Sequence, residues 1–370
     1  MTAMVTKFRR FTDRLLGRGE AAVTLPPMDG ALRPNTLLEH ASVLAQVQAP
    51  DNLVCHGGEL LCSSGARLLR LDAASGALTP WIEFEAAVTA MTSLPDGGLA
   101  VALVDGQLLR VDGSHSRVLT GLGRYRGFCP TALLADGDTS LIVLEGSAEH
   151  RCDQWQRDLM MKGCSGSVWR LDLAGGESAC LASGLAWPAG VAWDADGSLV
   201  VSESWRHRLR RIATGPGAAR SSDLLTDLPG YPGRLVPANG GGYWLALFAP
   251  RSQLVEFVLR EKEYRLRMIA DIDQRFWVAP ALESGRDFRE PLQGGAIKSM
   301  GILKPWAPTR SYGLLVRLDG AWQPRFSLHS RADGTRHGVT SALEHGEQLL
   351  VASKGGHCIL GLASDVTGEA

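Results

Sequence analysis

The feature that most constrains the fold is a repeat in which two short apolar strands follow a turn rich in Gly and Asp. The first strands of the pairs begin at residues 60, 99, 141, 199, 243 and 349, so successive pairs are 39, 42, 58, 44 and 106 residues apart. A repeat of about forty residues that carries several short strands is typical of a propeller blade. Six repeats therefore predict an all-β fold, a six-bladed β-propeller.

A further strand follows most pairs and completes a four-stranded blade. Such segments occur at 79–84, 116–122, 178–184, 221–228 and 324–330, but none follows the sixth pair, which ends at residue 363. The apolar segment ASVLAQV at 41–47 is the natural replacement. An N-terminal strand paired with the last blade would leave no open sheet edge between the chain ends. We therefore predict one propeller over 31–364, between a tail at 1–30 and a tail at 365–370.

The two longest steps predict insertions, about 146–167 in blade 3 and about 254–311 in blade 5. Much of the second insertion has the spacing of an amphipathic helix. Aromatic and Met side chains on lids at a propeller mouth indicate a helical cap over an apolar pocket. The alternative is that these segments only pack against the propeller. The apolar positions are Trp155, Leu159, Met160 and Met161 in blade 3, and Val255, Val258, Leu259, Leu266, Ile269, Ile272 and Trp306 in blade 5.

The charge balance and the apolar runs of the sequence limit the partners and the cellular location that we expect. Lys and Arg total 38 against 39 Asp and Glu, a net charge of -1, which gives no reason to expect nucleic acid. The chain has no run of 18 apolar residues and no apolar stretch of a signal peptide at its start, so we expect a cytoplasmic protein. Residues 1–20 carry five basic and two acidic side chains. They form a frayed tail, a helix docked on the chain's own domain, or a basic amphipathic helix in weak contact with the inner membrane face.

The cysteine pattern fits a reducing compartment. Seven cysteines form no CxxC pair and no zinc-binding spacing. Cys152 and Cys164 flank one loop and are the pair that could form a disulfide on oxidation, although we expect reduced thiols.

Four segments carry a resemblance to a known family. The stretch 185–212, LAWPAGVAWDADGSLVVSESWRHRLRRI, resembles a blade of the strictosidine synthase-like proteins, as do 230–252 and 340–353. The stretch 291–319 resembles the bacterial branch of that family. The resemblance covers about 30–363 and implies membership of a six-bladed propeller superfamily that includes gluconolactonases, regucalcin and paraoxonases. It implies hydrolysis of lactones or esters, which many of these proteins perform with a calcium ion at the propeller axis.

The resemblance also implies where calcium ligands would stand, at the start of the innermost strands of several blades. Calcium takes six to eight oxygen ligands, and inner strands converge on one axis. Asp51 and Asn52 keep oxygen-bearing side chains. The other three positions depart from the family pattern, so we expect no cofactor, with calcium on Asp51 and Asn52 as the alternative. The departing segments are Cys129-Pro130-Thr131, Ala189-Gly190 and Pro232-Gly233-Arg234.

The catalytic Glu of the plant strictosidine synthases matches a position near Thr340. Threonine does not serve as an acid or base at neutral pH, so the family's bond-forming reaction is not expected here. The likeness therefore predicts a fold rather than a reaction.

Candidate site residues follow from the predicted mouth of the propeller. Asp51, Glu145, His337 and Glu203 are candidates for acid–base catalysis or for orienting water. For Glu203 a structural role beside Arg206 and Arg208 is the favoured alternative, and His337 is equally a solvated rim residue. Candidate substrate-binding residues are Asn52, Thr89, Thr131, Trp187, Arg234, Phe248, Trp306 and Thr340.

The primary functional hypothesis is a hydrolase that acts on a lactone or ester of an apolar small molecule. A non-catalytic ligand-binding propeller and a bond-forming or lyase enzyme are the alternatives. Convergence of Asp51, Glu145 and His337 would favour chemistry. Blockage of the axis by Arg234 with a Phe or Met side chain would favour binding.

Overall fold

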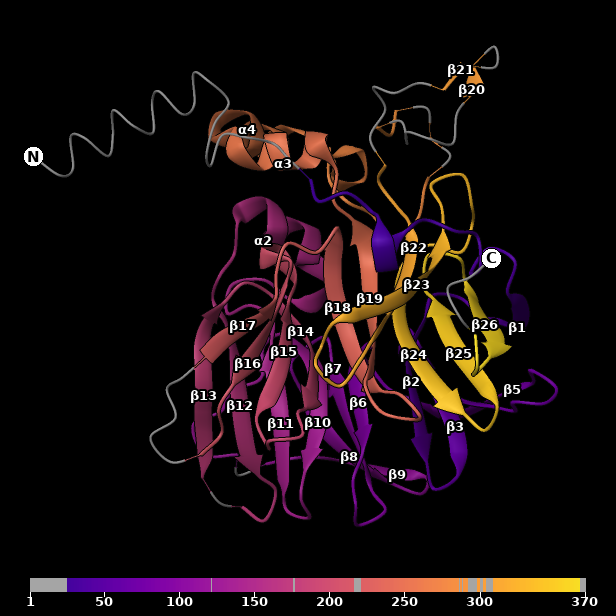
Figure 1. Cartoon of the computed structure of the whole chain (residues 1–370). Coiled ribbons are helices and arrows are strands. Elements are labelled where there is room, and N and C mark those ends of the chain that lie inside the picture. Colours follow the sequence, from indigo (N-terminus) through magenta and orange to yellow (C-terminus); the bar gives the residue numbers. More distant parts are fainter. Residues whose placement is uncertain are drawn as a thin grey trace, which may run out of the picture.

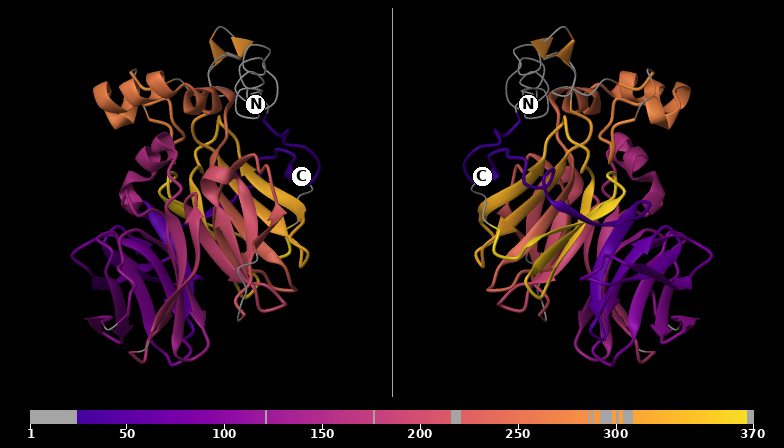
Figure 2. Two further views of the ribbon diagram at one scale, coloured as in Figure 1. Left: turned by 90° about the vertical axis from the view of Figure 1, so that its left-hand side faces the viewer. Right: turned by 90° about the vertical axis from the view of Figure 1, so that its right-hand side faces the viewer.

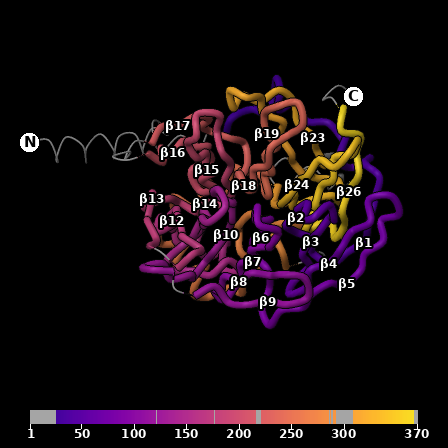
Figure 3. Tube along the Cα trace, turned by 90° about the horizontal axis from the view of Figure 1, so that it is seen from below, coloured from indigo at the N-terminus to yellow at the C-terminus, as the bar shows by residue number. Residues whose placement is uncertain are grey.

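Six four-stranded antiparallel sheets form the body of the computed structural model, and they are arranged as blades around one axis (Figures 1 and 3). The structure describes residues 25–366 apart from positions 121, 176, 216–220, 286, 288, 292–297, 300–301 and 304–308. The predicted six-bladed β-propeller is confirmed. The predicted basic segment at 1–20 and Trp306 lie outside the described residues.

Each blade has the strand order that the repeat predicted, with its first strand nearest the axis (Figure 3). Blade 1 consists of β2 (Pro50–His56), β3 (Glu59–Ser64), β4 (Arg67–Leu71) and β5 (Leu78–Glu83), and blade 2 of β6 (Val88–Ser93), β7 (Leu99–Leu103), β8 (Leu108–Asp112) and β9 (His115–Val118). Blade 3 consists of β10 (Pro130–Asp136), β11 (Ser140–Glu145), β12 (Gly166–Asp172) and β13 (Ser178–Leu185), and blade 4 of β14 (Pro188–Trp193), β15 (Leu199–Glu203), β16 (Arg208–Ile212) and β17 (Ser221–Leu225). Blade 5 consists of β18 (Gly230–Pro237), β19 (Tyr243–Pro250), β22 (Gly313–Leu318) and β23 (Pro324–Ser330), and blade 6 of β24 (Val339–His345), β25 (Gln348–Ser353), β26 (Cys358–Ala363) and β1 (Ser42–Gln46).

The N-terminal strand closes the ring. β1 pairs antiparallel with β26, from Ser42 opposite Gly361 to Gln46 opposite Cys358, which confirms the prediction for 41–47. Just before this strand, Leu38 is fully buried in a cluster formed mainly by blades 5 and 6. Blade 6 therefore contains strands from both the N-terminal and the C-terminal part of the described chain.

The core lies between neighbouring blades. The second strands β3, β7, β11 and β15 are buried on both faces over almost their whole length, because each sheet is covered by the blade before it and the blade after it. Outer strands are solvated, and every residue of β9 is exposed. The continuous apolar runs in the sequence therefore mark positions inside the ring of blades.

Helices lie at one end of the propeller (Figure 2) and form what we call the cap. The cap consists of α2 (Trp155–Met161) from blade 3, and α3 (Gln253–Arg260), α4 (Lys262–Asp271) and the 3-10 helix η5 (Gln274–Phe276) from blade 5. Three more short 3-10 helices, η2 (Gly30–Leu32), η3 (Cys152–Gln154) and η4 (Ser204–Arg206), and a hairpin of β20 (Lys298–Ser299) with β21 (Ile302–Leu303) complete the described elements.

The apolar face predicted for the blade-5 insertion is only partly right. Val255 and Val258 are buried, whereas Leu266 and Ile272 are exposed and Met268 is buried in their place. The reason is a break at Glu261, where ψ turns to 84° and separates α3 from α4. The helical spacing therefore does not continue across the insertion. Among the described helices none is long and apolar enough to cross a membrane.

Candidate functional site

A cavity of about 350 Å³ lies at the propeller axis under the cap, and we call it the axial pocket. Its floor is polar, and its walls are mostly apolar. Trp155 of α2 and Leu282, which follows η5, bring the cap into the wall. The floor residues used below are Asp51, Thr89, Thr131, Arg234, Thr340 and Lys354, and the wall includes Val88, Val104, Trp155, Trp187, Phe248 and Leu282.

Equivalent positions of the inner strands supply the floor. Asp51, Thr89, Thr131 and Thr340 are each the second residue of an inner strand, and all four line the pocket. The pairing of every inner strand with its neighbour shifts register close to its start. Such irregularities redirect side chains that a regular strand would aim at the next blade. The repeat therefore directs one residue from each of several blades towards the axis.

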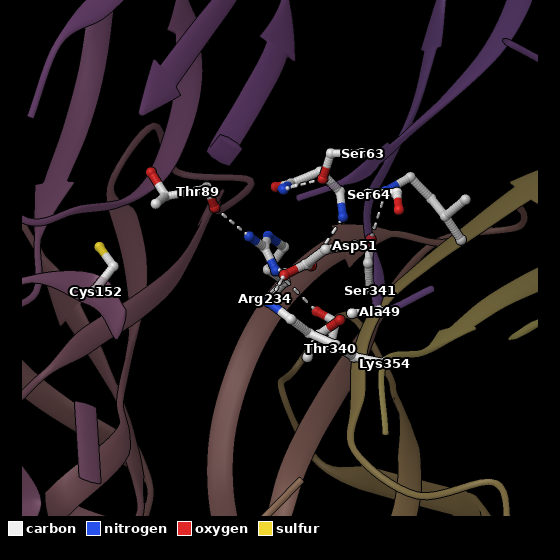
Figure 4. A network of polar contacts seen from close by, with 12 residues as sticks. Ala49, Asp51, Ser63, Ser64, Thr89, Cys152, Arg234, Thr340, Ser341 and Lys354 are labelled. Carbon is white, nitrogen blue, oxygen red and sulfur yellow. Dashed lines mark hydrogen bonds and ion pairs between the residues drawn. The ribbon is translucent and has the colours of Figure 1, made fainter. Parts of the chain in front are cut away.

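Arg234 joins four blades at this floor (Figure 4). It extends from β18, where the pairing with β19 is irregular between Pro232 and Leu235. Its Nη1 donates to Oδ1 of Asp51 at 2.5 Å and to the backbone oxygen of Thr340 at 3.3 Å, and its Nη2 donates to the backbone oxygen of Thr89 at 2.6 Å. The guanidinium is therefore held in place by oxygen atoms from blades 1, 2 and 6.

Asp51 is held by two cations. Lys354, which follows β25, places Nζ 3.0 Å from Oδ2 of Asp51, opposite the contact with Arg234. Burial by itself would raise the pKa of this carboxyl, but the charges of Arg234 and Lys354 outweigh burial and lower the pKa to about 2. The carboxylate is therefore a poor proton acceptor at neutral pH, because a general base works best with a pKa near the working pH.

A calcium ion does not fit this floor. The carboxylate of Asp51 and the backbone oxygens of Thr89 and Thr340 already surround the positively charged guanidinium of Arg234. Ala189 and Gly233, which also line the pocket, have no oxygen in their side chains. In the described part of the chain, no group of three or more His, Cys, Asp and Glu side chains is placed to hold a metal ion.

Three buried polar atoms near the inner-strand starts have no hydrogen-bond partner among the described residues, namely Oγ1 of Thr340, Oδ1 of Asn52 and the hydroxyl of Tyr231. Asn52 itself does not line the pocket. Its Nδ2 donates to Ser63 at 2.9 Å, and its φ of 51° places it in the left-handed region. Thr340 lines the pocket, but its Oγ1 is itself buried, so a rotation of the side chain is needed to present this hydroxyl to a ligand there.

The two Glu candidates end β11 and β15 as expected, but they are not among the residues that line the pocket. Glu145 accepts hydrogen bonds from Tyr125 and from the backbone N–H groups of Phe128 and Cys129, and burial raises its pKa. Glu203 is fully buried and accepts from the Ala186 N–H at 2.8 Å. Arg206 and Arg208 each bind Glu203 at 2.6 Å, the partners that the sequence indicated.

His337 is also separate from the lining of the axial pocket. Its Nδ1 lies 2.8 Å from Oγ of Ser311 and its Nε2 lies 2.7 Å from the backbone oxygen of Arg331. The side chain is buried rather than solvated at the rim, and burial lowers its pKa. Asp51, Glu145 and His337 therefore do not converge on one site, whereas Arg234 and Phe248 both line the pocket.

Aromatic side chains form one wall. Trp187, which precedes β14 with a φ of 57°, lines the pocket and stacks on Trp205 at 5.2 Å between ring centroids. Trp155 also stacks on Trp205, with ring centroids 6.3 Å apart, and it makes a T-shaped contact with Phe248. Oγ1 of Thr131 donates a hydrogen bond to the backbone oxygen of Pro188 at 2.6 Å, so Thr131 links blades 3 and 4.

Three lining residues with titratable side chains, Lys354, Cys152 and Asp153, were not among the site candidates of the sequence analysis. Lys354 follows the second strand of blade 6, one position beyond the place that Glu145 and Glu203 occupy in their blades, and this equivalence was the available signal. Cys152 lines the pocket with Sγ 3.3 Å from Sγ of Cys129. The sulfur that Cys152 contacts is therefore that of Cys129 and not that of Cys164, the partner that the sequence suggested.

Comparison with known proteins supports the assignment of the fold. No protein-family model matches the chain. Human adipocyte plasma membrane-associated protein is 29% identical over 127 residues, and this match spans 31% of the chain and only 30% of that relative. A gluconolactonase of Xanthomonas campestris superposes with a TM-score of 0.54 at 14% identity over 88% of each chain. Regucalcin of Agrobacterium tumefaciens, a calcium-binding protein, superposes with a TM-score of 0.50 at 13% identity over 84% of each chain. At these identities the likeness establishes the propeller fold alone.

Proposed function

We propose that the chain is a small-molecule hydrolase that cleaves a lactone or ester in the axial pocket without a metal ion. The observation that carries this proposal is the guanidinium of Arg234, fixed at the pocket floor by oxygen atoms from three blades. The name of the gluconolactonase with the same fold supports the choice of reaction by analogy. The apolar wall supports a substrate with an apolar body.

In this reaction water adds to the carbonyl carbon and the ester C–O bond breaks, which gives a carboxylate and a hydroxyl. One proton of the water ends on the leaving oxygen, and the other is released to bulk solvent. Negative charge develops on the carbonyl oxygen in the transition state. A fixed cation in a site with little water stabilises that charge without having to reorganise. Arg234 is the group that would do so here, with Lys354 beside it. Asp51 holds both cations in position and would accept a hydrogen bond from the attacking water rather than take its proton.

A second candidate is a ligand-binding propeller without catalysis, which is favoured because Glu145 and His337 do not line the pocket beside Asp51 and because of two features of its floor. The carboxylate at the pocket floor is tied to two cations, and its pKa of about 2 makes it a weak base. Its contact with Arg234 also fills part of the axis with protein atoms. Binding then needs no group that titrates near neutral pH.

The experiment that separates the two candidates is hydrolysis of a panel of γ- and δ-lactones and aryl esters by the full chain. Each reaction is run with added calcium and with a chelator. The hydrolase proposal expects the same turnover in both conditions and its loss in Arg234→Met. Turnover that disappears with the chelator would refute the metal-free site. No turnover on the panel, together with saturable quenching of Trp fluorescence by the same compounds, would establish the binding candidate.

A matched control removes a cation from outside the pocket. Lys262 is exposed on α4, and Lys262→Met should leave turnover and fold unchanged. Thermal unfolding of Arg234→Met, followed by circular dichroism, verifies that lost turnover is not lost fold. An Arg234→Met protein that is folded and fully active would remove Arg234 from the mechanism.

A further inference from the structure

The floor groups Arg234, Lys354 and Asp51 together carry a net positive charge, although the exposed carboxylate of Asp153 on η3 also lines the pocket. Arg234 and Lys354 contribute two cations, and Asp51 is the carboxylate that both contact. The side chain of Lys354 is 33% exposed, and among the described residues its ammonium contacts Asp51 alone, although an ammonium has three N–H donors. Donors at Lys354 are therefore free to bind a ligand from the cavity.

A neutral donor stands beside the two cations. Thr340 is buried and lines the pocket, and its Oγ1 has no hydrogen-bond partner among the described residues. Its backbone oxygen is 3.3 Å from Nη1 of Arg234, so the hydroxyl belongs to the same part of the floor (Figure 4). A buried polar group without a partner costs free energy, which a bound acceptor would recover.

The rest of the pocket favours an apolar body. Trp155, Trp187 and Phe248 line it together with aliphatic side chains. The cavity of about 350 Å³ has room for about twelve waters at roughly 30 Å³ each, which corresponds to a ligand of about a dozen non-hydrogen atoms. The pocket therefore offers a polar end and an apolar end to one small ligand.

We propose that the floor is an anion subsite in which Lys354, Arg234 and the hydroxyl of Thr340 bind the carboxylate of a small amphipathic acid. The apolar part of the acid lies against Trp155, Trp187 and Phe248. A single carboxylate balances the charges of Arg234, Lys354 and Asp51, and the exposed Asp153, which also lines the pocket, leaves no positive charge for a second anion. Because hydrolysis of a lactone yields a carboxylate, this subsite would hold the product end if the proposed function is correct. Binding of the acid itself does not require hydrolysis.

The test compares octanoate with octanamide, which has the same number of non-hydrogen atoms and no charge. Binding to the full chain is measured at pH 7.5 by Trp fluorescence and by calorimetry. We expect octanoate to bind at least tenfold more tightly than octanamide, because charge-assisted hydrogen bonds are about twice as strong as neutral ones. Equal binding of the two probes, or no binding of either, would overturn the anion subsite.

Substitutions identify the residues. Lys354→Met should remove the preference for octanoate, and Lys354→Arg should restore it because the charge is kept. Thr340→Val should weaken octanoate several-fold and leave octanamide unchanged. Lys262→Met on α4 serves as the control that removes a remote cation. A preference that survives in Lys354→Met, or that Lys354→Arg fails to restore, would contradict the proposal.

The result is separable from the proposed function. Octanoate that binds selectively to a chain with no turnover on the lactone panel would keep the anion subsite and refute the hydrolase. Turnover of lactones without selective binding of octanoate would keep the hydrolase and refute the subsite.

Discussion

Nη1 of Arg234 on β18 lies 2.5 Å from Oδ1 of Asp51 on β2, a contact between residues 183 positions apart that crosses the propeller axis. The same guanidinium binds backbone oxygens of β6 and β24. One side chain of blade 5 therefore connects three other blades at the point where the inner strands meet. A cation of the protein itself therefore lies at the centre of the floor, surrounded by oxygen atoms of these blades.

The first prediction concerns the coupling of this pair. Removing either partner leaves the other charge partly buried, so Arg234→Met and Asp51→Asn should each destabilise the protein by about 2–4 kcal/mol. The double variant should lose less than the sum, with a coupling of about 1–3 kcal/mol in a double-mutant cycle. Urea unfolding followed by circular dichroism measures all three variants. Strictly additive losses would show that the contact carries no coupling.

The second prediction concerns pH. Asp51 has a pKa of about 2 in the folded protein against an ordinary value of 3.8, so the unfolded chain binds its proton more readily. Its stabilisation is therefore complete above pH 3.8 and is lost as the pH falls towards 2, and it amounts to about 2 kcal/mol. The stability difference between wild type and Asp51→Asn should shrink by that amount between pH 5 and 2. Other carboxylates with lowered pKa values, such as Glu39, cancel in the difference. A difference independent of pH would contradict the lowered pKa.

Much of the fold could be predicted from the sequence because its signals are local. Each hairpin joins strands a few residues apart, and the spacing of apolar pairs marks each blade. The closing strand could also be predicted, because the sixth pair of strands lacks a fourth strand after residue 363. Ser42–Gln46 supplies that strand. The break between α3 and α4 had no such signal, because Glu261 is neither Gly nor Pro and its backbone angles follow from packing.

The candidate site was harder to predict because its contacts are distant in sequence. The inner-strand positions Asp51, Thr89 and Thr340 could be placed near the axis from the repeat. The partnership of Lys354 with Asp51 spans 303 residues and depends on how the blades meet. Glu145 was placed correctly at the end of its strand, but Tyr125 and the N–H groups before β10 turn its carboxylate away from the pocket. The periodicity of the sequence predicts on which face of a strand a residue lies, but it does not identify the residues that its side chain contacts.

The third prediction tests the structural role of Glu203. This carboxylate is fully buried and joins the Ala186 N–H to Arg206 and Arg208. Glu203→Gln should cost about 2–4 kcal/mol because two guanidinium groups lose their counter-charge, while affinity for pocket ligands stays unchanged. Glu83→Gln, at an exposed position on β5, should change stability by less than about 0.5 kcal/mol. Loss of turnover at full stability would instead place Glu203 in the chemistry.

The fourth prediction concerns closure of the ring. Leu38 is fully buried against a cluster that includes Trp244, Leu328 and Val339. Leu38→Ala should therefore cost about 2–5 kcal/mol, the range for a buried Leu that leaves a cavity. Val43→Ala on β1 is the matched control, because that side chain is 36% exposed and should cost under about 1 kcal/mol. Urea midpoints compare the two variants, and equal midpoints would mean that the N-terminal segment does not lock the propeller.

The fifth prediction concerns the two sulfur atoms beside the pocket. Sγ of Cys129 and Sγ of Cys152 are 3.3 Å apart, so a small movement brings them to the roughly 2.05 Å of a disulfide. With oxidised glutathione, one thiolate should form a mixed disulfide and release one glutathione, and the second cysteine should then displace the other glutathione. Burial raises the pKa of Cys129, so the cross-link should form slowly at neutral pH and faster as the pH rises. Mass spectrometry of a non-reduced digest should find the 129–152 peptide pair, and Cys152→Ser should abolish it. A digest in which Cys152 is joined to Cys164 would contradict this geometry.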